Sequence, residues 1–329
     1  MQVLPLADAY GRVATDLRVS LTDRCNLRCS YCMPAEGLDW LPNDDVLDDD
    51  EVVRLVRIAV ERLGVDEVRF TGGEPLVRRG LVDIVARTRA ISPDLELSIT
   101  SNGLGLARTA QALADAGLDR VNVSLDTVRR DTFHEMTRRD RLDDVVAGLE
   151  AAAAAGLGPV KVNAVLMRGV NDDQAAELLR WCLERSYELR FIEQMPLDAQ
   201  HGWSRDGMIT ADEIFAALDQ EFELTPAEEP RGSAPAEKFL VDGGPATVGV
   251  IASVTRPFCG DCDRVRLTAD GQVRNCLFAR SESDLRASLR AGASDEELAQ
   301  LWVTAMGGKA AGHGIDGLQV SCRIAIWVS

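Results

Sequence analysis

The first two-thirds of the chain alternates short apolar runs with amphipathic segments, and this alternation constrains the fold most strongly. The apolar runs predict strands at residues 17–21, 68–70, 95–100, 121–125, 160–165 and 189–192. Helical periodicity between them predicts helices at residues 50–63, 81–90, 107–116, 142–155 and 173–185. Strands that alternate with helices of this length form parallel sheets from βαβ units. We therefore expect an α/β fold, a partial (βα)6 barrel resembling a TIM barrel.

The pattern changes near residue 210. A short helix is expected at residues 211–220, a Pro-containing loop at 225–236, and strands at 238–241 and 247–251. A chain of 329 residues also exceeds what one hydrophobic core usually supports. We expect a barrel domain over residues 1–209 and a smaller C-terminal α+β domain over residues 210–329.

The charge of the chain limits its partners. The net charge is −17, which argues against nucleic acid because duplex binding needs a basic face. A phosphate site would need a local cluster of arginine and lysine acting against this field. The sequence has no apolar run of about 18 residues and no secretory signal pattern. We expect a cytoplasmic protein that does not bind a membrane.

Six of the eight cysteines fall into two groups, a pattern that in cytoplasmic proteins indicates metal or redox chemistry more often than disulfides. The first group, Cys25, Cys29 and Cys32, has the spacing Cys-x3-Cys-x2-Cys. A [4Fe–4S] cluster usually takes four cysteines, so three leave one iron open to another ligand. A zinc site, which needs four ligands, and a chance grouping are the alternatives.

The segment Cys25-x3-Cys29-x-Tyr31-Cys32 resembles the signature of the radical S-adenosylmethionine superfamily. Thr71-Gly72-Gly73-Glu74-Pro75 resembles the glycine-rich motif of the same family, and glycine permits close backbone approach. The resemblance implies a partial six-stranded βα barrel. It also implies that S-adenosylmethionine binds the open iron and is cleaved to a 5′-deoxyadenosyl radical.

The second group, Cys259, Cys262 and Cys276, has the spacing Cys-x2-Cys-x13-Cys. We interpret it as a second cluster with an open iron, with Arg264 and Arg266 close by as anchors for a polyanion. A zinc site completed by Cys322 is the alternative.

Both cysteine groups, together with Asn122-Val123-Ser124-Leu125-Asp126, resemble the GTP 3′,8-cyclase family of molybdenum cofactor biosynthesis. The resemblance runs from about residue 8 to about residue 315. It implies that the radical abstracts the 3′ hydrogen of GTP and that the ribose radical then attacks C8 of guanine. An electron donor and a downstream pyranopterin-forming enzyme are the implied partners. A homodimer is left open.

The resemblance also implies roles for single residues. Two [4Fe–4S] clusters would be held by Cys25, Cys29 and Cys32, and by Cys259, Cys262 and Cys276. S-adenosylmethionine would contact Tyr31, Gly73, Ser124 and Met195. GTP would contact Arg18, Arg69, Thr100, Lys161, Arg264 and Arg266.

The family pattern is lost after residue 316. Members of the family end in Gly-Gly, which reaches the active site, whereas residues 317–329 differ and lack it. We expect the altered terminus to affect activity and to leave the fold intact. Two other functions stay open, a peptide-modifying radical enzyme with an auxiliary cluster and a non-enzymatic metal-binding protein.

Overall fold

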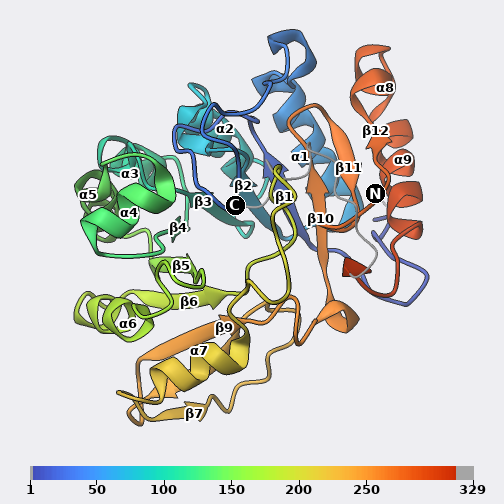
Figure 1. The fold of residues 1–329 in the computed structure, drawn as a ribbon. Helices are drawn as coiled ribbons and strands as arrows, with labels where there is room; N and C mark the ends of the chain where they lie inside the picture. The colour runs from blue at the N-terminus through green and yellow to red at the C-terminus, as the bar shows by residue number, and fades with distance from the viewer. Residues whose placement is uncertain (1–2, 316–329) are drawn as a thin grey trace.

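The computed structural model describes residues 3–315 (Figure 1). The strands of the first part are β1 (Asp16–Ser20), β2 (Glu67–Thr71), β3 (Glu96–Ser101), β4 (Arg120–Ser124), β5 (Lys161–Val165) and β6 (Glu188–Ile192). The helices between them are α1 (Asp49–Leu63), α2 (Leu81–Arg89), α3 (Leu106–Asp115), α4 (Arg130–Thr137), α5 (Leu142–Ala154) and α6 (Ala175–Glu184). The strands that follow are β7 (Leu224–Pro226), β8 (Glu237–Val241), β9 (Thr247–Ile251), β10 (Arg264–Leu267), β11 (Gln272–Arg274) and β12 (Ser283–Asp284). The later helices are α7 (Ala211–Leu218), α8 (Arg286–Arg290) and α9 (Asp295–Gly307).

Within residues 3–315, all strands belong to one sheet, in the order β12-β11-β10-β1-β2-β3-β4-β5-β6-β9-β8-β7. Strands β1 to β6 pair in parallel and in sequence order. Strand β10 adds in parallel to β1, and β9 adds in parallel to β6. The later part of the chain therefore extends both edges of the barrel sheet, as Figure 1 shows with β10 beside β1 and β9 beside β6.

The two faces of each barrel strand differ because side chains alternate along a strand. Leu17 and Val19 on β1 and Val68 and Phe70 on β2 are fully buried and belong to the main core cluster, together with apolar residues of the helices. Arg18 lies on the opposite face of β1 and lines an internal cavity. The barrel is thus apolar toward its helices and polar toward its interior.

The expected α/β architecture is confirmed. The six strands and five helices predicted for the first part correspond to β1–β6 and to α1, α2, α3, α5 and α6. The helix and two strands predicted after residue 210 correspond to α7, β8 and β9. The prediction did not include α4, or β7 at the start of the expected 225–236 loop. It also did not include the elements after β9, which are β10, β11, β12, α8 and α9. The domain boundary at residues 209–210 stays a prediction.

No helix among residues 3–315 combines the length and the apolar character needed to cross a membrane.

Helix α9 offers a direct test of the packing. Trp302 is fully buried, whereas its neighbour Leu301 is 38% exposed. We expect Trp302→Ala to lower the free energy of unfolding by about 3–5 kcal/mol because it leaves a large cavity. The control Leu301→Ala should change it by less than about 0.5 kcal/mol. Urea denaturation followed by circular dichroism measures both, and equal losses would contradict this packing.

Candidate active site

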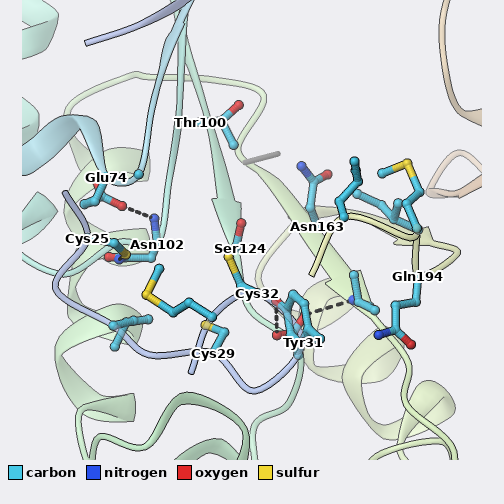
Figure 2. Close-up of a pocket in the computed structure, with 18 of the residues that line it drawn as sticks. Cys25, Cys29, Tyr31, Cys32, Glu74, Thr100, Asn102, Ser124, Asn163 and Gln194 are labelled. Carbon is cyan, nitrogen blue, oxygen red and sulfur yellow. Dashed lines mark hydrogen bonds between the residues drawn. The ribbon is translucent and has the colours of Figure 1, made fainter. Parts of the chain in front are cut away.

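A cavity lies at the C-terminal ends of the barrel strands, and the first cysteine group lines it (Figure 2). Cys25, Cys29 and Cys32 come from the loop after β1. The ends of the other barrel strands contribute polar residues to the same lining, among them Glu74, Asn102, Ser124, Asp126, Asn163 and Gln194. The four residues predicted to contact S-adenosylmethionine, Tyr31, Gly73, Ser124 and Met195, all lie in this lining.

The donor atoms of this cavity fit an iron–sulfur cluster. Burial raises the pKa of Cys25, Cys29 and Cys32, that of Cys32 to about 12, and a bound metal would remove these protons. Among residues 3–315, no three His, Cys, Asp or Glu side chains are grouped to hold a single metal ion. The four irons of a cubane let each thiolate bind a separate metal atom, so its thiolates surround a cavity and need not converge on one point.

Helix α4, which the sequence analysis missed, holds the cysteine loop. The backbone N–H groups of Arg28 and Ser30 donate to the carbonyls of Thr137 and Met136, at 3.1 and 2.8 Å. Arg138 follows the helix with a φ of 56°. Its Nη1 donates to the carbonyls of Arg28 and Met33, at 2.8 and 2.9 Å. The end of α4 thus fixes the backbone on both sides of Cys29.

The glycine pair after β2 allows the cysteine loop to approach that strand. A Cβ at Gly72, where φ is 141°, would lie 2.5 Å from the Thr22 carbonyl oxygen. A Cβ at Gly73 would lie 2.4 Å from the carbonyl oxygens of Asp23 and Arg24. The backbone N–H of Gly73 donates to the Thr22 carbonyl oxygen at 2.8 Å. A side chain at either glycine would therefore push the loop away from β2.

A partly buried hydrogen bond fixes Tyr31, which lies between Cys29 and Cys32 in the sequence. The Tyr31 hydroxyl donates to Asp126 Oδ2 at 2.8 Å, and Asp126 Oδ1 accepts the N–H of Val165 at 2.8 Å. Burial raises the pKa of Asp126 to about 6, although both hydrogen bonds oppose the shift. The cysteine loop is thereby tied to β4 and β5 as well as to β2.

The second cysteine group lines a second cavity inside the barrel. The same cavity is lined by five arginines, Arg18, Arg69, Arg190, Arg264 and Arg266. Arg18 lies in register between Arg69 on β2 and Arg266 on β10. Because residues paired in register on neighbouring strands lie on the same face of a sheet, these three arginine side chains point into the same cavity.

The positive charges of this cavity alter the pKa values of its own groups. Burial, together with repulsion from Arg18, lowers the pKa of Arg266 to about 9. Although burial opposes it, attraction to Arg264 and Lys309 lowers the pKa of Cys262 to about 7. The cavity therefore favours an anionic ligand and a thiolate.

Residues far apart in the sequence hold the second cysteine group. Lys309 Nζ donates to Cys262 Sγ at 3.3 Å and to the Arg264 carbonyl at 2.9 Å. Arg12 Nη1 donates to the carbonyls of Cys259 and Ala311, at 2.7 and 3.0 Å. The two ends of the described chain thus meet at these cysteines.

The two cavities adjoin. Thr100, Asn163, Ile192 and Met195 line both of them. Lys161 lines neither cavity, although it is a predicted GTP contact. It lies two residues before Asn163 on β5, where burial, assisted by the charge of Arg190, lowers its pKa to about 8. The other predicted GTP contacts, Arg18, Arg69, Thr100, Arg264 and Arg266, line the second cavity.

Sequence reasoning missed two residues that line the second cavity and one that holds its cysteine group. Arg190 and Asn163 alternate with buried residues on β6 and β5, so their period-2 pattern could have indicated an inward position. Lys309 gave no such signal because its contacts to Cys262 and Arg264 span more than 40 residues. The prediction about the missing Gly-Gly concerns residues 316–329, which lie outside the described residues.

Two family models match the chain. The Radical SAM superfamily model matches residues 19–182, and the Molybdenum Cofactor Synthesis C model matches residues 187–315. The GTP 3′,8-cyclase of Streptomyces coelicolor is 68% identical over 312 residues, which cover 94% of this chain and 92% of that protein. The GTP 3′,8-cyclase of Mycolicibacterium smegmatis is 62% identical, with 95% of this chain and 88% of that protein covered.

Solved structures share the fold at low sequence identity. Streptococcus suis SuiB bound to S-adenosylmethionine superposes with a TM-score of 0.59 at 14% identity. That match covers 83% of this chain and 64% of SuiB, just under two thirds of its length. Methylornithine synthase (PylB) superposes with a TM-score of 0.51 at 14% identity, with 91% of this chain and 84% of that chain covered. The family models and the relatives at 60–68% identity together establish that the chain belongs to the GTP 3′,8-cyclase family of the radical S-adenosylmethionine superfamily.

Proposed function

We propose that the chain catalyses the radical cyclisation of GTP to (8S)-3′,8-cyclo-7,8-dihydroguanosine 5′-triphosphate, the first step of molybdenum cofactor biosynthesis. Relatives that carry the name GTP 3′,8-cyclase, at 60–68% identity over most of the chain, support this reaction. The observation that carries the proposal is the junction of the two cysteine-lined cavities at Thr100, Asn163, Ile192 and Met195. A radical formed in one cavity would meet a nucleotide held in the other at this junction.

The first cavity would hold a [4Fe–4S] cluster on Cys25, Cys29 and Cys32, with S-adenosylmethionine beside it. When bound, the reduced cluster and S-adenosylmethionine supply the carbon radical that removes the 3′ hydrogen of GTP. Tyr31, Gly73, Ser124 and Met195 would contact S-adenosylmethionine. Asp126 holds the Tyr31 hydroxyl, and Gly73 keeps the cysteine loop against β2, so both would orient the cofactor.

The second cavity would hold GTP. Cys259, Cys262 and Cys276 would bind a second cluster, which would supply an iron ligand site for the purine. The triphosphate would bind Arg18, Arg69, Arg264 and Arg266, whose guanidinium groups form strong paired hydrogen bonds with phosphate oxygens. Arg190, which shares this cavity, would add to the same field. Lys161 lines neither cavity, so it would act on the triphosphate only through the electrostatic field of its charge.

Aromatic rings beside the arginines of the second cavity support a site that contains little water. The Phe258 ring lies 5.1 Å from the Arg264 guanidinium and 4.6 Å from that of Arg231. Phe258 and Phe278 also line the second cavity. Where these rings displace water, they would strengthen the charge interactions with a triphosphate and protect a ribose radical from side reactions.

The reaction implies further partners. A one-electron donor would reduce the first cluster, and a downstream enzyme would convert the cyclised nucleotide to a pyranopterin. We propose that these steps take place in the cytoplasm. A homodimer stays a prediction.

An anaerobic assay tests the proposed function. The iron-reconstituted protein is incubated with dithionite, S-adenosylmethionine and GTP, and 5′-deoxyadenosine and the cyclised nucleotide are measured. We expect both products in parallel. 5′-Deoxyadenosine without the cyclised nucleotide would have two explanations, the altered terminus or another substrate, and a Gly-Gly peptide added in trans distinguishes them. Failure of that peptide to restore cyclisation would contradict the proposed substrate, and the absence of both products would favour a non-enzymatic metal-binding protein.

Removal of one cavity arginine should weaken GTP binding. We expect Arg18→Ala to raise the Kd of GTP by about 10- to 100-fold, the effect of losing charge-assisted hydrogen bonds. Arg18→Lys should lose less because it keeps the charge. Calorimetric titration of the reconstituted protein measures this, with Arg180→Ala on α6 as the control because Arg180 pairs with Glu221 at the surface. An unchanged Kd in Arg18→Ala would contradict the phosphate site.

Removal of the second cysteine group should remove one cluster only. We expect the Cys259→Ala/Cys262→Ala/Cys276→Ala variant to lose about half of the bound iron, since each cubane holds four irons. Iron analysis and electron paramagnetic resonance of the reduced protein check this. Zinc in the parent protein, with unchanged iron in the variant, would favour the zinc alternative.

A further inference from the structure

Asn102 is a polar residue of the first cavity for which the proposed reaction gives no role. It directly follows β3 and lines the cavity beside Cys25 (Figure 2). Its side-chain Nδ2 donates to Cys25 Sγ at 3.7 Å and to Asn26 Oδ1 at 2.7 Å. Asn102 therefore contacts both the first cysteine and the residue that follows it.

The orientation of the Asn102 amide is fixed by its other end. Asn102 Oδ1 accepts the backbone N–H of Leu104 at 2.9 Å. Exchanging the amide oxygen and nitrogen would place two donors against each other at Leu104 and two acceptors against each other at Asn26. The hydrogen-bond partners thus assign the N–H group, and not the oxygen, to the side that faces the Cys25 sulfur.

Glu74 fixes the backbone of Asn102. Glu74 Oε2 accepts the N–H of Asn102 at 2.6 Å, and Figure 2 shows this bond. Glu74 Oε1 accepts the Ser101 hydroxyl at 2.8 Å and the N–H of Leu76 at 2.9 Å. Glu74 is 1% exposed. The donor that faces Cys25 is therefore held by a buried network that joins the ends of β2 and β3.

We propose that Asn102 is a positioning residue for the first cluster, and that its hydrogen bond to Cys25 raises the reduction potential of that cluster. Reduction adds negative charge that is shared by the thiolate ligands. A hydrogen-bond donor at a thiolate sulfur stabilises this charge, and such bonds are among the factors that set cluster potentials. The inference rests on the proposal that Cys25 ligates the cluster, and it holds whatever the nucleotide substrate is.

The potential of the first cluster alone tests this inference. The full-length chain with Cys259→Ala, Cys262→Ala and Cys276→Ala serves as the parent, so that only the first cluster contributes to the measured redox signal. Its midpoint potential is measured by redox titration with electron paramagnetic resonance detection, without S-adenosylmethionine or GTP. Asn102→Leu keeps a similar volume and removes the donor.

We expect Asn102→Leu to shift the one-electron reduction equilibrium about tenfold toward the oxidised cluster, which is a potential lower by about 59 mV. Asn102→Asp keeps the size and the acceptor for Leu104 but places a carboxylate beside the sulfur, so its potential should fall further. Loss of iron from the first site alone in Asn102→Leu would also support the inference. It would mean that the hydrogen bond from Asn102 is needed to keep Cys25 in position to ligate the cluster.

The matched control carries Asn102→Leu in a chain with Cys25→Ala, Cys29→Ala and Cys32→Ala. The potential of the second cluster should not change there, because Asn102 lines only the first cavity. Potentials equal to the parent in both Asn102 variants would overturn the inference. Equal shifts, or equal iron losses, at both clusters would overturn it as well. Because no nucleotide is present, these outcomes are independent of whether the chain cyclises GTP.

Discussion

Strand β10 lies parallel to β1, with Arg266 opposite Arg18 and Arg264 opposite Asp16. This pairing joins residues almost 250 positions apart, and the second cavity depends on it, because Arg264 and Arg266 of β10 line that cavity together with Arg18 of β1. The cysteine loop follows β1, whereas Cys259 and Cys262 immediately precede β10. A parallel pair places the start of one strand beside the start of the other, so the second cysteine group enters at the opposite end of the barrel from the first. The space between the two groups is the barrel interior, where the cavities adjoin.

The barrel interior is rich in positive charge, although the chain as a whole is negatively charged. The net charge is −17, yet five arginines line the second cavity. Nearby carboxylates compensate part of this charge. Glu67 accepts hydrogen bonds from Arg69 at 2.6 Å and from Arg120 at 2.7 Å, and Glu188 accepts two from Arg190, at 3.0 and 2.7 Å. Burial and repulsion from Arg18 both lower the pKa of Arg266, as expected where positive charge is held away from water. A bound triphosphate would offset this positive charge, which is the physical basis of the proposed GTP site.

The sequence indicated the repeated βα units because their periodicity is local, and the cysteine spacing indicated two metal sites because three thiols close in sequence have few other uses. The pairing of β10 with β1 could not be predicted, since Arg264–Leu267 is only four residues long and its partner is remote. Helix α4 was missed although it holds the cysteine loop. The contact of Asn102 with Cys25 depends on how the ends of β1, β2 and β3 meet, and no local pattern encodes that arrangement.

The central claim of this account is that a radical generated in the first cavity reaches the ribose of a nucleotide held in the second. Transfer of deuterium from GTP labelled at C3′ tests it most directly, with S-adenosylmethionine and the reduced, iron-reconstituted protein. The account predicts one deuterium in the 5′-deoxyadenosine formed, and none when the label is at C2′. Unlabelled 5′-deoxyadenosine from GTP labelled at C3′, formed together with the cyclised product, would contradict it.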